Sequence, residues 1–165
     1  MVTDCHAGQV FLLDYTGMGL KIPEMVKERL VVVVSPRSIN VDNGLATVVP
    51  LSITAPRARQ NHVVPLSKDY AWIKGRPQLW AKTDLIYTPA LERLRFVDRV
   101  EVADRPPTNH NPVPQISHAD LKNIRLGMAH AVGLNEYLLH GEKRGFSSFL
   151  TERYKKLLKR LSKKH

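Results

Sequence analysis

Short apolar runs alternate with turn-forming residues along the N-terminal part of the chain. The most distinct run lies in residues 29–37, where five consecutive aliphatic residues, four of them valines, follow Arg29. β-Branched side chains favour an extended strand, and an unbroken apolar run is typical of a strand covered on both faces. Proline lacks an N–H group and restricts the residue before it, so Pro36 should end the strand. We therefore predict a central strand that begins at Arg29.

Further apolar runs predict strands before and after this one. They are residues 9–15, 45–53, 62–66 and 80–88. Pro65 favours an edge position for its run, because proline cannot donate to a central ladder. The glycines and proline of residues 17–24 predict a loop, and residues 40–44, with Asp-Asn-Gly, predict a turn. Several short strands with turns between them are typical of an all-β barrel or sandwich.

The composition changes after Val102. Residues 104–114 contain four prolines, which indicates a semi-rigid linker. The segment from Ser117 to Asp120 is similar to a capping box, which starts a helix. Apolar residues then recur at helical spacing, at Leu121, Ile124, Met128 and Val132. We predict a helix whose apolar face packs on the strands or on a second copy of the chain.

A second amphipathic stretch closes the chain. Apolar residues recur with a helical period over residues 146–161, with basic residues largely between them. Residues 151–165 hold seven Lys/Arg and one acid, and therefore six of the ten net positive charges. This tail docks on the rest of the protein, contacts RNA or DNA, or lies on an anionic surface, and docking is our leading interpretation. The patterns predict three parts: a β domain (1–103), a Pro-rich linker (104–116) and a helical extension with a basic tail (117–165).

The chain carries few signs of export or membrane insertion. No stretch reaches the roughly 20 apolar residues of a membrane span, and the first residues lack the basic and apolar regions of a signal peptide. Cys5 is the single cysteine, so no internal disulfide can form, as expected in a reducing compartment. We predict a cytoplasmic protein without a membrane partner. The net charge of +10 permits a polyanionic partner.

Candidate chemistry is sparse when residues are considered one by one. Arg29 stands at the mouth of the central strand, although strands often end in solvated arginines. Ser52 lies where an apolar run ends, a position at which serine often caps its own backbone. Trp72 and Trp80 suit either base stacking or core packing, and we favour the core. The seven histidines show no metal-ligand spacing, so we predict no metal and no cofactor.

Three segments, taken in order, resemble the PemK/MazF family of toxins. They are residues 22–37, 44–52 and 81–94, and the resemblance covers roughly residues 8–94. The helical region is similar to the extension of the PemK-like growth inhibitors. The resemblance implies a small SH3-like barrel of the PemK/MazF/CcdB type, usually a homodimer, which a cognate antitoxin inhibits.

The resemblance also implies a metal-independent endoribonuclease that cuts single-stranded RNA. In such enzymes the ribose 2′-hydroxyl attacks its own phosphate and leaves a cyclic phosphate and a free 5′-hydroxyl. The reaction needs a group that neutralises the charge on the phosphorane and groups that move two protons. An arginine suits the first task because its planar fork binds phosphate oxygens and stays charged.

The family's motifs assign roles to residues of this chain. Arg29 matches the catalytic arginine, Ser52 matches a small hydroxyl residue, and Asp84 matches an aspartate of the site in some members. Further candidates for RNA binding are Lys27, Arg57, His62 and Lys82.

The chain departs from the family pattern beside the proposed catalytic arginine. Leu30 follows Arg29 where proline is usual, and Glu28 precedes it where a basic residue is usual. An acid next to this cation weakens the attraction of RNA unless it points away. Gln9 and Lys82 also replace the usual acid and arginine. The alternative function is therefore a non-catalytic barrel module that binds nucleic acid or a protein partner, including poisoning of another enzyme.

Overall fold

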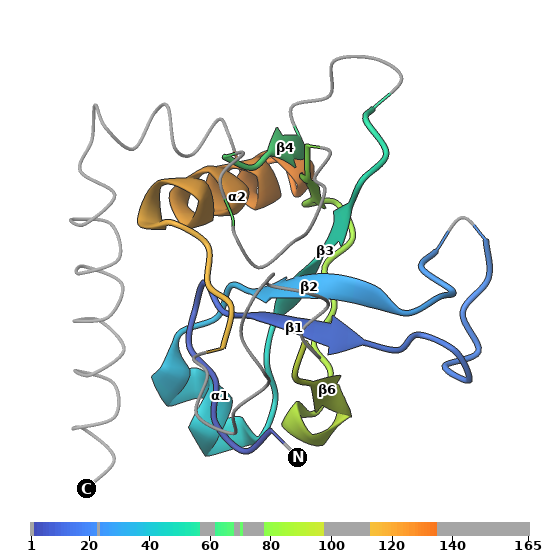
Figure 1. Ribbon diagram of the computed structural model, residues 1–165, viewed down its shortest axis with the longest axis vertical. Helices are drawn as coiled ribbons and strands as arrows, with labels where there is room; N and C mark the ends of the chain where they lie inside the picture. The colour runs from blue at the N-terminus through green and yellow to red at the C-terminus, as the bar shows by residue number, and fades with distance from the viewer. Residues whose placement is uncertain are drawn as a thin grey trace, which may run out of the picture. The chain divides into compact units, whose positions relative to one another are not determined.

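Six short strands pair into one antiparallel sheet in the order β4-β5-β3-β2-β1-β6 (Figure 1). The computed structural model describes residues 2–22, 24–56, 62–67, 70, 78–97 and 113–134. The strands are β1 (Val10–Leu13), β2 (Arg29–Val33), β3 (Val48–Ser52), β4 (Val63–Pro65), β5 (Trp80–Lys82) and β6 (Leu94–Arg95). The helices are α1 (Arg37–Asn43), the 3₁₀ turn η1 (Leu91–Arg93) and α2 (His118–Ala131).

The predicted central strand is confirmed as β2. It pairs with β1 on one side, from Val10↔Val32 to Leu13↔Arg29, and with β3 on the other. Side chains alternate across a strand, and Val31 and Val32 accordingly belong to different hydrophobic clusters. The first cluster contains Phe11, Leu13 and Tyr15, and the second contains Leu51, Leu121 and Ile124. Both faces of β2 are thus buried, as its unbroken run of valines predicts.

The edges of the sheet also agree with the sequence. β4 pairs only with β5 within the described residues, which confirms the edge position predicted from Pro65. β4 and β6 end the strand order and, in the described part of the chain, do not pair with each other. The mainly β class is confirmed, and the expected barrel is an open sheet in these pairings.

One predicted turn is a helix. Residues 40–44 were expected to turn, but α1 extends to Asn43, and only Gly44 takes a positive φ, of 64°. The side chain of Asn40 is completely buried, and its amide donates to the carbonyl oxygens of Cys5 (3.1 Å) and Ser35 (3.3 Å). These hydrogen bonds, one of them to a residue 35 positions away, outweigh the local turn preference of Asn.

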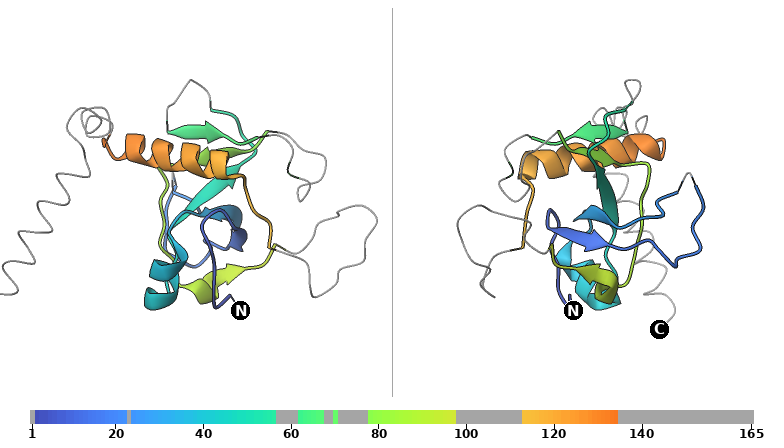
Figure 2. Two further views of the ribbon diagram at one scale, coloured as in Figure 1. Left: turned by 90° about the vertical axis from the view of Figure 1, so that its left-hand side faces the viewer. Right: turned by 45° about the vertical axis from the view of Figure 1, so that its right-hand side comes forward.

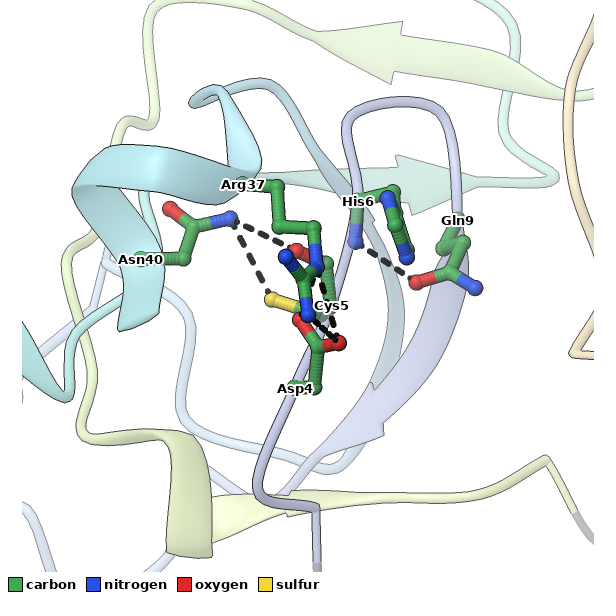
Figure 3. A network of polar contacts seen from close by, with 6 residues as sticks. All are labelled: Asp4, Cys5, His6, Gln9, Arg37 and Asn40. Atoms are coloured by element: carbon green, nitrogen blue, oxygen red, sulfur yellow. Dashed lines mark hydrogen bonds and ion pairs between the residues drawn. The ribbon is translucent and has the colours of Figure 1, made fainter. Parts of the chain in front are cut away.

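The N-terminal segment is fastened to α1 at two points (Figure 3). Asn40 binds the backbone of Cys5, and the guanidinium of Arg37 donates from Nε and Nη2 to the carboxylate of Asp4 at 2.7–3.0 Å. Burial raises the pKa of the Cys5 thiol, whereas the Arg37 hydrogen bonds lower the pKa of Asp4. The segment therefore belongs to the folded core and not to a loose terminus.

The observed strands are shorter than the predicted ones, and two cases affect the candidate site. Residues 45–53 form β3 only from Val48 to Ser52, and residues 80–88 form β5 only as far as Lys82. The chain then turns and returns to the sheet at Tyr87, which bridges to Val48. Opposite Pro50, the residues of this turn do not pair with β3. Since Val48 donates its N–H toward Tyr87 and N–H directions alternate along a strand, the missing N–H of Pro50 faces this gap.

The helix predicted after Ser117 is confirmed as α2. The Ser117 hydroxyl accepts the backbone N–H of Asp120 at 3.1 Å, which caps the first turn. Leu121 and Ile124 are buried in the second cluster. Val132 was expected to join them, but the helix ends at Ala131 and Val132 is 58% exposed.

The Asp120 carboxylate ties α2 to the chain after β4. It accepts the backbone N–H of Ser67 at 3.0 Å and the hydroxyls of Ser67 and Tyr70. The Tyr70 oxygen in turn accepts the backbone N–H of Ser117 at 2.7 Å. Figure 2 shows α2 lying alongside β4, and the two are in contact.

Residues 113–116, the end of the predicted linker, lie along the start of β1. The N–H of Val10 donates to the Pro114 carbonyl (2.8 Å), and the N–H of Ile116 donates to the Gly8 carbonyl (2.9 Å).

By its contacts the chain separates into a unit of residues 1–131 and a unit of residues 132–165, so α2 belongs with the strands. The three-part division predicted from the sequence stays a prediction. The linker up to residue 112 and the tail after residue 134 lie outside the described residues. Among the described helices, none is long and apolar enough to cross a membrane.

Candidate functional site

Arg29 lies at the rim of the sheet. It is the first residue of β2 and is exposed, and its register partner is Leu13 of β1. Its Nη1 donates to the carbonyl oxygen of Glu28 at 3.3 Å, so the guanidinium lies beside its own backbone. The buried valines that follow fix the position of the residue, while its charged end stays in solvent, as suits the binding of an anion.

Ser52 lies at the same end of the β2–β3 ladder as Arg29. The last paired positions are Val31 and Pro50, and Arg29 and Ser52 each lie two residues beyond them. Alternation assigns both residues to the same face. The Ser52 oxygen accepts the N–H of Thr54 at 3.1 Å, which is the local capping that serine favours at a strand end. Its hydroxyl hydrogen is still able to donate to a phosphate oxygen.

A second group of candidate residues gathers where β5 ends. His62 Nε2 lies 3.8 Å from Asp84 Oδ2, and both side chains are partly exposed. Thr83 is completely buried and donates to the His62 carbonyl from its N–H (3.0 Å) and its hydroxyl (2.6 Å). Lys82 pairs with Val63 of β4. An imidazole beside a carboxylate is a suitable arrangement for proton transfer.

By alternation Lys82 lies on the same face of the sheet as Ser52, but at a different position along β5. Ser52 pairs with Trp80, which is half-buried. Lys82 is two residues further along β5, which is about 7 Å of extended strand. Asp84 follows in the turn, on the side away from Ser52. The structure therefore places Arg29 and Ser52 at one end and Lys82, Asp84 and His62 at another.

The remaining sequence candidates divide between described and undescribed residues. Lys27 is exposed two residues before β2, so it adds a second cation near Arg29. Arg57 and Trp72 lie outside the described residues. In the part of the chain that the structure describes, no three His, Cys, Asp or Glu side chains gather as metal ligands do.

Sequence reasoning missed Arg95, which binds the acid next to Arg29. Arg95 of β6 donates from Nη2 to the carboxylate of Glu28. The two residues are 67 positions apart, so no local pattern indicates the pair. The charge of Arg95 also acts on Asp14. The pKa of Asp14 is lowered mainly by hydrogen bonds from Thr16, with smaller contributions from the positive charges of Arg95 and Arg93.

Comparison with known proteins gives one family and a set of similar structures. The family model described as "PemK-like, MazF-like toxin of type II toxin-antitoxin system" matches residues 6–109. No curated protein matches the chain.

Solved structures resemble the chain at low identity. An endoribonuclease in complex with its cognate antitoxin, from a mycobacterial species, is 20% identical with a TM-score of 0.52, over 79% of this chain and 96% of that one. MazF from Deinococcus radiodurans is 18% identical with a TM-score of 0.53, over 79% of this chain and 97% of that one. The MazE-MazF structure from the same organism is 17% identical with a TM-score of 0.51, with 79% and 96% covered. At these identities the likeness concerns the fold.

Proposed function

We propose, since this chain belongs to the PemK-like, MazF-like toxins of type II toxin–antitoxin systems, that it is a metal-independent endoribonuclease of single-stranded RNA. The observation that carries the proposal is the exposed Arg29 at the mouth of a buried strand, with Ser52 at the same end of the ladder. A rigid strand supports each residue, which is what a catalytic site requires.

The proposed reaction follows from the chemistry of these two side chains. The ribose 2′-oxygen attacks the adjacent phosphorus and the bond from phosphorus to the 5′-oxygen breaks, which gives a 2′,3′-cyclic phosphate and a 5′-hydroxyl. Arg29 binds the phosphate oxygens on which charge develops, and Ser52 donates a hydrogen bond to the same group. Lys27 binds a neighbouring phosphate.

We assign the proton transfers to the side chains at the end of β5. One proton leaves the 2′-hydroxyl and another reaches the departing 5′-oxygen, so a base and an acid are needed. Asp84 is the proposed proton-transfer group, with His62 at 3.8 Å as its partner. The assignment requires the RNA to cross from the Arg29 end of the sheet to Lys82, which would bind its backbone together with Arg57.

The proposal includes two protein partners. One of the similar structures holds an endoribonuclease with its cognate antitoxin, and we propose an antitoxin for this chain as well. A net charge of +10 favours an acidic one. We further propose that the toxin acts as a homodimer in the cytoplasm, where its RNA substrates are.

The first prediction concerns cleavage by the purified full-length chain. We expect single-stranded RNA to be cut with EDTA present and Arg29→Ala to lower kcat/KM by about a hundredfold or more, because a preorganised donor to the developing charge is lost. Mapping of the product ends should find cyclic phosphates and 5′-hydroxyls.

Arg37→Ala is the matched control for this substitution. It removes an exposed arginine that is bound to Asp4 and should leave the cleavage rate unchanged. Intact RNA at high enzyme concentration would contradict the proposal. If growth inhibition then persisted in Arg29→Ala and Ser52→Ala, the non-catalytic binding module would be the correct function.

A further inference from the structure

The acid that departs from the family pattern has two cations within its reach. Glu28 immediately precedes Arg29, and the Arg29 guanidinium contacts the Glu28 backbone at 3.3 Å. The Glu28 carboxylate is nevertheless bound to Arg95. Arg29 thus contacts the backbone of Glu28, while Arg95 binds its side chain.

The strand register explains how Arg95 comes to bind Glu28. β1 lies between β2 and β6: Leu13 pairs with both Arg29 and Leu94, and Leu12 pairs with both Leu30 and Arg95. Leu13 and Leu94 belong to the first hydrophobic cluster. Alternation consequently puts Arg29 on the face of that cluster and Arg95 on the opposite one. Arg95 draws the acid to the face away from Arg29.

Glu28 is outside the regular ladder, so the sheet alone does not fix its direction. The register between β1 and β2 begins at Arg29, and the Glu28 side chain is 40% exposed. Without Arg95, the flexible carboxylate would be free to reach the neighbouring guanidinium. There it would occupy the donors that a phosphate needs and add a negative charge beside it.

We propose that Arg95 is a positioning residue that holds the Glu28 carboxylate away from Arg29 and so keeps the Arg29 guanidinium available to phosphate. This inference rests on the proposed function, because it assigns phosphate binding to Arg29. It also accounts for an acid in a place where the family usually has a base. Arg95 takes no part in the chemistry itself.

The test is a double-mutant cycle on the full-length chain. The variants are Arg95→Ala, Glu28→Gln and the double variant, with Arg95→Lys as the charge-conserving change. We expect Arg95→Ala to lower kcat/KM by about two- to fivefold, the range of an exposed ion pair. The loss should appear mainly in KM, since the freed acid repels bound phosphate. Glu28→Gln should abolish the effect of Arg95→Ala, and Arg95→Lys should retain most of the activity.

Binding of a 2′-deoxy oligonucleotide, which cannot be cut, separates this inference from the proposed function. Failure of the wild type to cut RNA, with the binding cycle as expected, would refute only the nuclease. Arg95→Ala with unchanged affinity, or a loss that persists in the Glu28→Gln background, would overturn the positioning role. Absence of oligonucleotide binding by the wild type would overturn both. Arg37→Ala, which breaks an exposed ion pair with Asp4, should match the wild type in every assay.

Discussion

Tyr15 is among the most deeply buried large side chains of the protein, at 1% exposure. Its ring meets Tyr87 edge-on, with centroids 4.9 Å apart. Its hydroxyl has no hydrogen-bond partner among the described residues, whereas the Tyr87 side chain is only partly buried. Burial raises the pKa of Tyr15 far above its ordinary 10.0. Tyr15 therefore contributes packing alone.

Tyr15→Phe should stabilise the protein. The substitution removes a buried, unpartnered hydroxyl and keeps the ring, so we expect the free energy of unfolding to rise by about 1 kcal/mol. Tyr87→Phe is the matched control and should change it little, because the Tyr87 side chain is only partly buried. Urea unfolding of both variants measures the difference, and a destabilised Tyr15→Phe would contradict the burial argument.

The same residue should affect stability in alkali. The raised pKa means that the Tyr15 phenol stays protonated in the folded state at a pH where it ionises in the unfolded state. The stability contributed by this difference is complete below pH 10.0 and is lost as the pH rises from 10.0 toward the folded-state pKa. The wild type should therefore lose stability above pH 10.0 more steeply than Tyr15→Phe.

The sequence indicated some of the candidate residues and gave no sign of Arg95, for an identifiable reason. Arg29 and Ser52 stand at the borders of apolar runs, where the chain itself signals the end of a buried strand. No local pattern indicates Arg95, because its proposed role depends on an ion pair with Glu28, 67 positions away. The importance of the pair follows only from the strand order.

At the scale of elements, α2 approaches the sheet closely at Gly127. A Cβ built there would lie 2.7 Å from Val64 Cγ2 and 2.8 Å from Thr83 Oγ1. Both distances are shorter than normal contacts, and Thr83 is held by its hydrogen bond to the His62 carbonyl. Glycine is thus required by packing, although it weakens an isolated helix.

Gly127→Ala should destabilise the protein by about 1–3 kcal/mol, because the added methyl overpacks the contact between α2 and β4. Asn123→Ala, at an exposed position of the same helix, should change stability by less than about 0.5 kcal/mol. Thermal unfolding compares the two variants. Equal melting temperatures for Gly127→Ala and Asn123→Ala would contradict the close approach.

Elements with a local signal were predicted well, and those that depend on distant partners were not. The valines of β2 and the cap at Ser117 act within a few residues. The turn predicted over residues 40–44 follows from local residue types, whereas the helix α1 depends on the buried Asn40, which donates to the carbonyl of Cys5, 35 positions away. β6 has only two residues, too few for any pattern to reveal.

At the scale of the whole molecule, the net charge should govern the affinity for RNA. Phosphate contacts release counterions, so affinity falls with salt in proportion to the number of contacts. If Lys27, Arg29, Arg57 and Lys82 supply these contacts and the basic tail docks on the protein, the logarithmic slope for a single strand should be about −3. Titration of a 2′-deoxy oligonucleotide at several salt concentrations measures it.

The slope distinguishes the interpretations of the tail, which lies outside the described residues. Full engagement of its seven cations would add about −5 to the slope. A value that steep would reject docking as the tail's main role and favour direct contact with RNA.

The turn opposite Pro50 has a consequence for how this sheet can change in evolution. Between the paired positions Val48↔Tyr87 and Leu51↔Ala81, one strand advances by three residues and its neighbour by six. Each of these two pairings is held by its own strand contacts. Insertions or deletions in the segment between Ala81 and Tyr87 would therefore leave unchanged which side chains of both strands face the core. Asp84 lies in this segment, so a change in the segment's length would shift the proposed proton-transfer group relative to Arg29 while the surrounding architecture stays constant.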